Sequence, residues 1–311
     1  MNRHYFCKRI INYYKKNNFK GDIFILDGSN EEIANKNYKF IRENRKDISV
    51  KYLNEKGTAF VVQKEIIKEI KTDYVTYSGD DDYFLISGLK DIVGFLESNK
   101  NFIGANGKSF NIVCDGQFSD KIKLVYPWVQ TSRLEDTSLK RLKFQIRNYT
   151  VPVFSIFRKN SYIEMLNIVP SIKDVNKFCP DKPICDEILP AYSLSVFGKI
   201  KSLPCLHLIR TLHNPKYIKQ ALSDYNHLES KNEEFQKSFN FLKDKISNLQ
   251  FERENTSVSK TKELISDEYN KREKLLIKKR KNEKLKRNIF FIYRFFILFL
   301  ARIKNSSEKN F

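Results

Sequence analysis

Short apolar runs and amphipathic segments follow one another along the first two hundred residues. Apolar residues at helical spacing predict helices over residues 4–17, 30–45, 58–71 and 88–98. Continuous apolar or β-branched runs predict strands over residues 23–26, 48–54, 74–77, 101–113, 151–159 and 200–213. Strands that alternate with helices indicate an α/β fold, with a mostly parallel sheet covered by helices on both faces.

Acidic residues follow two of the predicted strands. Asp27 begins a Gly-Ser-Asn turn, and Asp80, Asp81 and Asp82 follow the strand at 74–77. Ligands of parallel sheets bind beyond the carboxyl ends of the strands, so we expect these acids to face one crevice. A divalent cation with oxygen ligands would stabilise such a cluster, and a solvated acidic turn is the alternative.

A second acidic pair lies in the segment 180–199, which has Pro183 in a position suited to the first turn of a helix. Asp186 and Glu187 come just inside this helix, and Pro190 predicts a kink or a later start. Acidic residues in the first turn of a helix also complement the helix dipole and stabilise the helix by about 0.3 to 1 kcal/mol. This effect alone would explain the pair without any role in chemistry. The less regular stretch 114–150 carries Trp128, which either stacks on a ligand or belongs to the core.

The C-terminal third has a different character. Residues 216–287 are rich in Lys, Glu, Asn and Ser and predict exposed helices or a loose helical arm. An apolar, aromatic block follows at 288–303. Thirteen Lys or Arg against two Glu lie between residues 271 and 304, about half of the formal net charge of +20.

A basic cluster beside an apolar segment is typical of binding to an anionic membrane surface. The block is shorter than the roughly 20 residues that a membrane span needs. One alternative is a helix that packs back on the globular body. Nucleic-acid binding is a lesser alternative, because charge alone gives only salt-sensitive, sequence-independent attraction.

Composition narrows the class of protein. The chain has 311 residues, of which 41% are hydrophobic and 14% aromatic, so it is long enough for a large core. Its five cysteines have no metal-binding or disulfide spacing, which favours a reducing cytosol. Lysines and arginines interrupt any apolar signal segment near the N-terminus, so we expect a cytoplasmic protein.

These motifs together resemble the inverting family 2 glycosyltransferases with the GT-A fold, above all bacterial members that build surface polysaccharides such as capsules. The resemblance covers about residues 2–213 and is carried by ILDGSN, by TDYVTYSGDDDYFLISGL and by DEILPAYSLSVFG. It implies a transferase that moves a sugar from a nucleotide-diphosphate donor to a glycan or lipid-linked acceptor. The alternative is a non-catalytic, membrane-peripheral interaction protein derived from a degraded glycosyltransferase.

The resemblance also implies roles for individual residues. Arg3, Asp27, Asp80 and Asp81 would bind the nucleotide-sugar, and Asp80, Asp81 and Asp82 would hold Mn²⁺ or Mg²⁺. The catalytic base would be Glu187 or Asp186; the family order is Glu-Asp, reversed here, and Glu187 is favoured by position. Candidate diphosphate contacts are His207, Arg210 and His213.

The resemblance, together with the composition of the C-terminal third, gives the chain three expected parts. They are a GT-A-like domain over 1–213, a charged helical arm over 214–287 and an apolar, basic tail over 288–311 that associates with the inner face of the cytoplasmic membrane. The family normally opens with a central strand before the segment that matches residues 1–4. We therefore expect that the natural product starts upstream or that this copy lacks the first strand.

Overall fold

The computed structural model describes residues 2–57, 59–116, 121–213, 232–279 and 282. The chain divides into two compact units, residues 1–265 and 266–311, and each is described by itself. In the second unit residues 266–279 are helical, and Lys271 pairs with Glu268 at 3.4 Å. The predicted domain boundary after residue 213 coincides with the start of a segment, 214–231, that lies outside the described residues. The predicted tail, 288–311, also lies wholly outside them.

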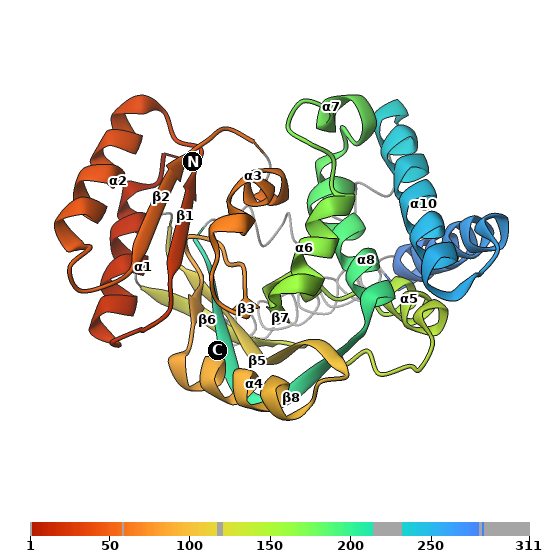
Figure 1. Cartoon of the computed structure of the whole chain (residues 1–311), viewed down its shortest axis with the longest axis horizontal. Coiled ribbons are helices and arrows are strands. Elements are labelled where there is room, and N and C mark those ends of the chain that lie inside the picture. The colour runs from red at the N-terminus through yellow and green to blue at the C-terminus, as the bar shows by residue number, and fades with distance from the viewer. Residues whose placement is uncertain (1, 58, 117–120, 214–231, 280–281, 283–311) are drawn as a thin grey trace, which may run out of the picture. The chain divides into compact units, whose positions relative to one another are not determined.

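A small parallel sheet and two helices form the N-terminal part of the first unit (Figure 1). Its strands are β1 (Ile23–Asp27) and β2 (Val50–Asn54), with Asp27 opposite Asn54 at the carboxyl ends. The helices are α1 (His4–Lys16) and α2 (Glu31–Asn44). Both predicted helices and both predicted strands are confirmed here. Their apolar faces share one core cluster, which includes Cys7, Ile11, Tyr14, Ile41 and Ile48.

The second sheet has six strands in the order β3-β7-β5-β8-β4, with β6 paired to β5. The strands are β3 (Tyr74–Val75), β4 (Tyr83–Phe84), β5 (Phe102–Cys114), β6 (Ile122–Trp128), β7 (Ile156–Arg158) and β8 (Lys199–Leu212). The α/β class is confirmed, but among the described strands only β1 with β2 and β5 with β8 pair in parallel. The other pairs are antiparallel; β6, for example, folds directly back on β5, and a short connection permits only that direction.

The next helices contact either strands or other helices of this unit (Figure 1). They are α3 (Ala59–Ile66) with the 3₁₀ turn η1 (Ile67–Glu69), α4 (Ile86–Ser98), α5 (Ser138–Arg147), the 3₁₀ turn η2 (Pro152–Phe154), α6 (Lys159–Ile168) and α7 (Val175–Phe178). Helix α4 approaches β8 so closely that a Cβ on Gly88 would lie 2.2 Å from the carbonyl oxygen of Leu206. This contact fixes the chain just after the acidic run.

Pro190 has the predicted effect on the helix that carries the second acidic pair. A π-helical turn, η3 (Ile184–Ile188), precedes the regular helix α8 (Leu189–Phe197). Proline has no backbone N–H to donate to the carbonyl oxygen four residues earlier. A π-helical turn accommodates the loss of that hydrogen bond. The turn places Asp186 and Glu187 beside a helix that is buried over most of its length.

Helix α10 (Glu233–Glu254) belongs to the same compact unit as the strands, although an exposed arm was expected here. Phe235, Leu242 and Ile246 are buried on one face of α10, which packs on α5, α7 and α8. Glu254 accepts hydrogen bonds from the backbone N–H groups of Ser138 and Leu139 at the start of α5. The polar composition of α10 therefore describes only its outer face.

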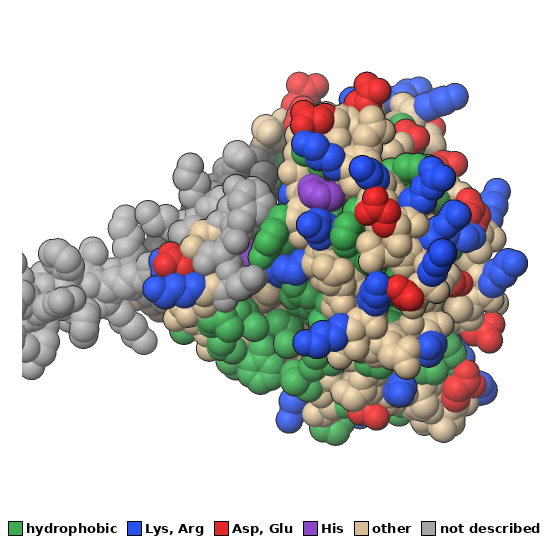
Figure 2. Space-filling model, turned by 90° about the vertical axis from the view of Figure 1, so that its left-hand side faces the viewer, with side chains coloured by type: hydrophobic (Ala, Val, Ile, Leu, Met, Phe, Trp, Pro, Cys, Tyr) green, Lys and Arg blue, Asp and Glu red, His purple; other side chains and the backbone are tan. Residues whose placement is uncertain are grey.

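The described surface carries mixed charge. Figure 2 shows Lys and Arg side chains interspersed with Asp and Glu on one face of the molecule, without a continuous basic stripe on that face. Among the described residues, no helix combines the length and apolar character needed to cross a bilayer.

Candidate functional site

The three consecutive aspartates lie in the turn between β3 and β4. The backbone N–H of Asp82 donates to the carbonyl oxygen of Gly79 at 3.3 Å. A Cβ at position 79 would lie 3.0 Å from an oxygen of Asp81 and 3.4 Å from one of Asp82. Glycine therefore lets the two carboxyl groups pack over the turn, and neighbouring residues of the run end up facing different partners.

Asp82 points into the protein. Only 4% of its surface is exposed, and Oδ1 accepts a hydrogen bond of 3.0 Å from the backbone N–H of Thr211. Nε of Arg210 lies 3.7 Å from Oδ2. Burial raises the pKa of Asp82 to about 7, although the nearby Arg210 acts in the opposite direction. This carboxyl group is thus tied to strand β8.

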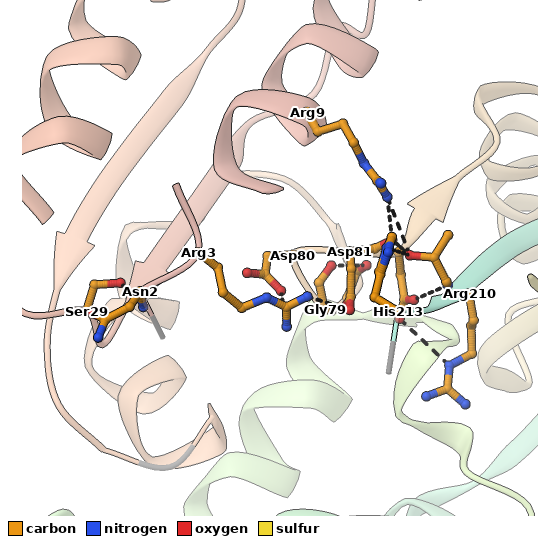
Figure 3. Close-up of polar contacts among 12 residues, drawn as sticks. Asn2, Arg3, Arg9, Ser29, Gly79, Asp80, Asp81, Arg210 and His213 are labelled. Carbon is orange, nitrogen blue, oxygen red and sulfur yellow. Dashed lines mark hydrogen bonds and ion pairs between the residues drawn. The ribbon is translucent and has the colours of Figure 1, made fainter. Parts of the chain in front are cut away.

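Asp80 and Asp81 instead share the guanidinium of Arg3 (Figure 3). Nη1 of Arg3 lies 3.1 Å from Oδ1 of Asp80, and Nη2 lies 2.5 Å from Oδ2 of Asp81. The guanidinium also lies over the ring of Phe6, 4.1 Å from its centroid. One cation from the start of α1 therefore bridges two of the three predicted metal ligands.

A second arginine of α1 reaches the same turn. Nη2 of Arg9 donates to the carbonyl oxygen of Asp81 at 3.3 Å and to Oγ1 of Thr211 at 3.4 Å. The hydroxyl of Thr211 donates to that carbonyl oxygen too, and Nε2 of His213 lies 2.9 Å from the hydroxyl oxygen. Figure 3 shows Arg9 and His213 converging there. Arg9 and Thr211 were not predicted, because nothing in their sequence neighbourhood marks them.

Asp27 lies in a polar network at the end of β1. Its carboxylate accepts hydrogen bonds from the N–H of Ser29 at 2.9 Å, the amide of Asn37 at 2.7 Å and the hydroxyl of Tyr52 at 2.7 Å. Burial alone would raise its pKa, but these hydrogen bonds outweigh burial and lower it. The carboxylate is therefore charged and fully engaged in holding the turn that follows β1.

The charges of both predicted acidic strand ends act on Cys7. Burial raises the pKa of Cys7 to about 12, and the charges of Asp27 and Asp80 both add to this effect. The segment before α1 also joins the two ends, since the N–H of Asn2 donates to Oγ of Ser29 at 2.7 Å while the next residue, Arg3, binds the aspartates.

Tyr77 connects the aspartate turn with the second acidic pair. Burial raises the pKa of Tyr77 to about 12, and the charges of Asp186 and of the three aspartates add to the shift. Its ring stacks on Phe154 at 6.2 Å between centroids. Glu187, next to Asp186, accepts a hydrogen bond of 2.8 Å from the hydroxyl of Tyr149. Carboxylates more than one hundred residues apart in sequence thus border one aromatic side chain.

Arg210 is held mainly by aromatic rings. Its guanidinium lies 4.4 Å from the ring centroid of Trp128 and 5.0 Å from that of Phe154. The two rings meet edge to face at 5.5 Å. Trp128 thus packs on a cation at the site, with one face turned to Arg210. The sequence offered Arg210 as a diphosphate contact but gave no sign of its aromatic support.

His207 occupies a different environment from Arg210 and His213. It is 1% exposed, its ring packs on Phe84 at 4.9 Å, and neither ring nitrogen has a hydrogen-bond partner among the described residues. Burial lowers its pKa to about 4. No hydrogen bond or ion pair within the described part of the chain joins His207 to the aspartates, so its predicted contact with a diphosphate gains no support.

The aspartates as arranged do not fit a divalent metal ion. Within the described ranges, no group of three His, Cys, Asp or Glu side chains converges as metal ligands would. Asp80 and Asp81 turn to Arg3, whereas Asp82 turns to Thr211 and Arg210. Guanidinium groups take the positions that a metal would need.

Comparisons with known proteins give only distant matches, and these are to solved structures. No family model and no curated protein sequence matches the chain. Among solved structures, residues 1–349 of TarS from S. aureus in complex with UDP-GlcNAc are similar with a TM-score of 0.49 and 12% identity, over 86% of this chain and 68% of that one. The complex of the same fragment with UDP has a TM-score of 0.41 and 12% identity, over 85% of each chain. Similarity at this level carries no argument about fold or chemistry.

Proposed function

We propose that the chain is a glycosyltransferase that moves a sugar from a nucleotide-diphosphate donor to a glycan or lipid-linked acceptor. The observation that carries the proposal is that the charges of two acidic groups far apart in the sequence both act on Tyr77. One group, Asp80 to Asp82, is faced by guanidinium groups. The other contains Asp186 and Glu187, and Glu187 accepts a hydrogen bond from Tyr149. A cationic site for a leaving diphosphate and a separate base are the two parts that glycosyl transfer needs.

The guanidinium groups would receive the diphosphate. As the bond between the anomeric carbon and the diphosphate oxygen breaks, negative charge develops on that oxygen. Arg3 and Arg210 present planar N–H donors, which match phosphate oxygens in two-point contacts. Each is only partly buried, at 28% and 29% side-chain exposure, so a ligand has access to both.

The second acidic pair would supply the base. The acceptor hydroxyl attacks the anomeric carbon, and its proton passes to the carboxylate of Glu187 or Asp186. A single displacement of this kind inverts the anomeric centre. Tyr149 donates its hydroxyl hydrogen to Glu187 and would orient that carboxylate. Glu187 is the favoured base, as it was from its position in the sequence.

Nucleotide binding separates this proposal from the non-catalytic alternative. We expect calorimetry of the full chain with UDP, GDP and CDP to detect micromolar binding of one of them. Arg210→Gln should weaken that binding about tenfold or more, because a hydrogen bond to a charged phosphate contributes about 1.5 to 3 kcal/mol. Arg45→Gln, at an exposed position just after α2, is the matched control and should bind normally. Absence of binding to all three nucleotides would favour the degraded, non-catalytic protein.

The wider setting of the reaction is also proposed here. Surface-polysaccharide synthesis would take place at the inner face of the cytoplasmic membrane, where lipid-linked acceptors reside. The basic, apolar tail at 288–311 would hold the protein against anionic lipid. Mn²⁺ or Mg²⁺ is implied by the family resemblance alone, because Asp80 and Asp81 turn to Arg3 in this arrangement.

A further inference from the structure

Arg133 is a cation in the interior of the protein. Its side chain is 0% exposed, and burial lowers the pKa of its guanidinium to about 10. The hydrogen bonds described for the guanidinium go to neutral oxygen atoms, which belong to Thr131, Gln145 and Thr150. A buried charge with only neutral partners costs stability, so this arginine calls for a role other than strengthening the core.

The guanidinium fastens Thr150 at two points. Nη2 of Arg133 donates to the carbonyl oxygen of Thr150 at 3.1 Å and to its hydroxyl oxygen at 2.5 Å. Nε of Arg133 donates to Oε1 of Gln145, and Nε2 of Gln145 donates to the same carbonyl oxygen at 2.9 Å. Residues 149–151 belong to no helix or strand. These hydrogen bonds therefore fix the backbone where regular secondary structure does not.

Arg133 is itself tied to the second sheet. Its backbone N–H donates to the carbonyl oxygen of Ile200 in β8 at 2.8 Å, and the N–H of Ile200 donates back at 3.0 Å. Its Nη1 also donates to the carbonyl oxygen of Thr131 at 3.0 Å. The position of Thr150 is thus set by the start of β8 as well as by α5, which carries Gln145.

The residue before Thr150 reaches the proposed base. The hydroxyl of Tyr149 donates to Oε1 of Glu187 at 2.8 Å. Tyr149 also lies close enough to Arg133 to oppose the effect of burial on the pKa of that guanidinium. Because Tyr149 and Thr150 share a peptide bond, whatever fixes the backbone of Thr150 also fixes the point from which the tyrosine side chain starts. Displacements of about 1 Å at a reacting group cost about 100-fold in rate.

We propose that Arg133 is a positioning residue, which acts through Thr150 to hold Tyr149 where that tyrosine orients the carboxylate of Glu187. This inference rests on the proposed function. The guanidinium is completely buried, so it acts on the reaction only through its neighbours. An apolar side chain of similar length would fill the same space but would leave the hydroxyl of Thr150 without this donor.

A double-mutant cycle tests the link between Arg133 and Tyr149. Arg133→Met and Tyr149→Phe should each lower kcat for the donor about tenfold, with KM for the donor little changed. Because both changes remove the same orientation of Glu187, the double variant should be no slower than the slower single variant. Independent effects would instead multiply to about 100-fold, and that result overturns the role of Arg133.

Arg141→Met is the matched control. Arg141 is also a buried arginine, and its guanidinium binds backbone carbonyl oxygens, among them those of Ser195 and Val196. Its described hydrogen bonds do not involve Thr150, so this change should leave kcat of the folded protein unchanged. Thermal melting shows which variants fold. If Arg133→Met does not, Thr150→Val removes only the hydroxyl acceptor and takes its place in the same cycle.

A second readout does not depend on turnover. Fluorine NMR of the full chain labelled with 3-fluorotyrosine reports on Tyr149, whose resonance is the one missing from Tyr149→Phe. Glu187→Gln should shift this resonance in the wild-type background and should shift it much less in the Arg133→Met background.

An equal shift in both backgrounds contradicts the positioning role. Absence of turnover in the wild type is a different failure, because it refutes the proposed transferase, while the NMR comparison still decides whether Arg133 positions Tyr149.

Discussion

At the scale of single residues, Asp80, Asp81 and Asp82 show what a sequence motif leaves open. The three aspartates were predicted to be equivalent ligands of one metal. In the structure Asp82 is buried against Thr211, and its neighbours bind Arg3. The motif supplies three carboxylates in one turn but does not say what each of them contacts. The directions of the side chains depend on the turn at Gly79 and on the pairing of β4 with β8, which local sequence does not encode.

The cations of the site illustrate a second limit. Arg3 and Arg210 were predicted from family resemblance, and Arg9 was not predicted at all. Its contacts with Asp81 and Thr211 join residues 72 and 202 positions apart in the chain. Such proximity arises only from tertiary folding, so no spacing rule could have identified it.

His207 leads to a prediction about pH. Burial lowers its pKa from 6.5 to about 4, so the neutral imidazole is favoured in the folded protein. The folded state then binds fewer protons than the unfolded state between pH 6.5 and 4, and stability falls as the pH drops through this window. The loss should approach about 3 kcal/mol for this one group.

Urea unfolding at pH 7.5 and pH 4.5 measures this loss. His207→Leu removes the titrating group and should lose less stability between the two pH values than the wild type does. Equal losses in the two proteins would show that His207 titrates normally and is not the buried neutral group described.

At the scale of elements, the pattern of apolar residues predicted the long central strands and the N-terminal helices. It did not predict the elements within the segment 114–150. It contains β6 and α5, which the sequence left irregular. Strand β6 lies at the edge of its sheet and keeps Ile122, Leu124 and Val125 half exposed, so its residues do not alternate as those of a half-buried strand would.

Helix α10 was predicted as a helix, but its packing was not. The abundance of Lys, Glu and Asn concealed a stripe of apolar residues at helical spacing, namely Phe235, Phe239, Leu242 and Ile246. That stripe was the available signal, and it packs α10 on the rest of the unit.

Leu242→Ala tests this packing. The side chain of Leu242 is fully buried, so its truncation should lower the free energy of unfolding by about 2 to 5 kcal/mol. The same change at Leu275, which is 68% exposed, is the matched control and should cost less than about 0.5 kcal/mol. Chemical denaturation measures both. Similar small effects at the two positions would mean that α10 is the loose arm that composition indicated.

At the scale of the whole molecule, function depends on joining distant segments. The site draws on the start of α1, the turn between β3 and β4, the π turn before α8 and the end of β8. The sequence supplied each part, and the family resemblance assigned the roles. The placement of these segments relative to one another depends on the sheet order β3-β7-β5-β8-β4. This order is difficult to predict because several of its strands are short and pair in antiparallel fashion.

The C-terminal tail leads to a prediction about membranes. Lys284 and Lys286 lie in the basic run before the apolar block, and each lysine near an anionic surface contributes about 1 kcal/mol. Changing both to Gln should weaken binding to vesicles with phosphatidylserine about thirtyfold. The same changes at Lys39 and Lys46, both exposed, should have little effect. Co-sedimentation measures the affinity, and equal effects of the two pairs would refute a specific role of the tail.

The central claim is that Asp186 and Glu187 act with the aspartate turn in one transfer site. Its most direct test is release of nucleoside diphosphate from a panel of UDP- and GDP-linked sugars. The full-length wild type is compared with Glu187→Gln and with the exposed control Glu43→Gln. We predict turnover of one donor by the wild type and the control, and a loss of about 100-fold or more in Glu187→Gln with nucleotide binding retained. Equal turnover by Glu187→Gln and the wild type, or no turnover of any donor, would contradict the account.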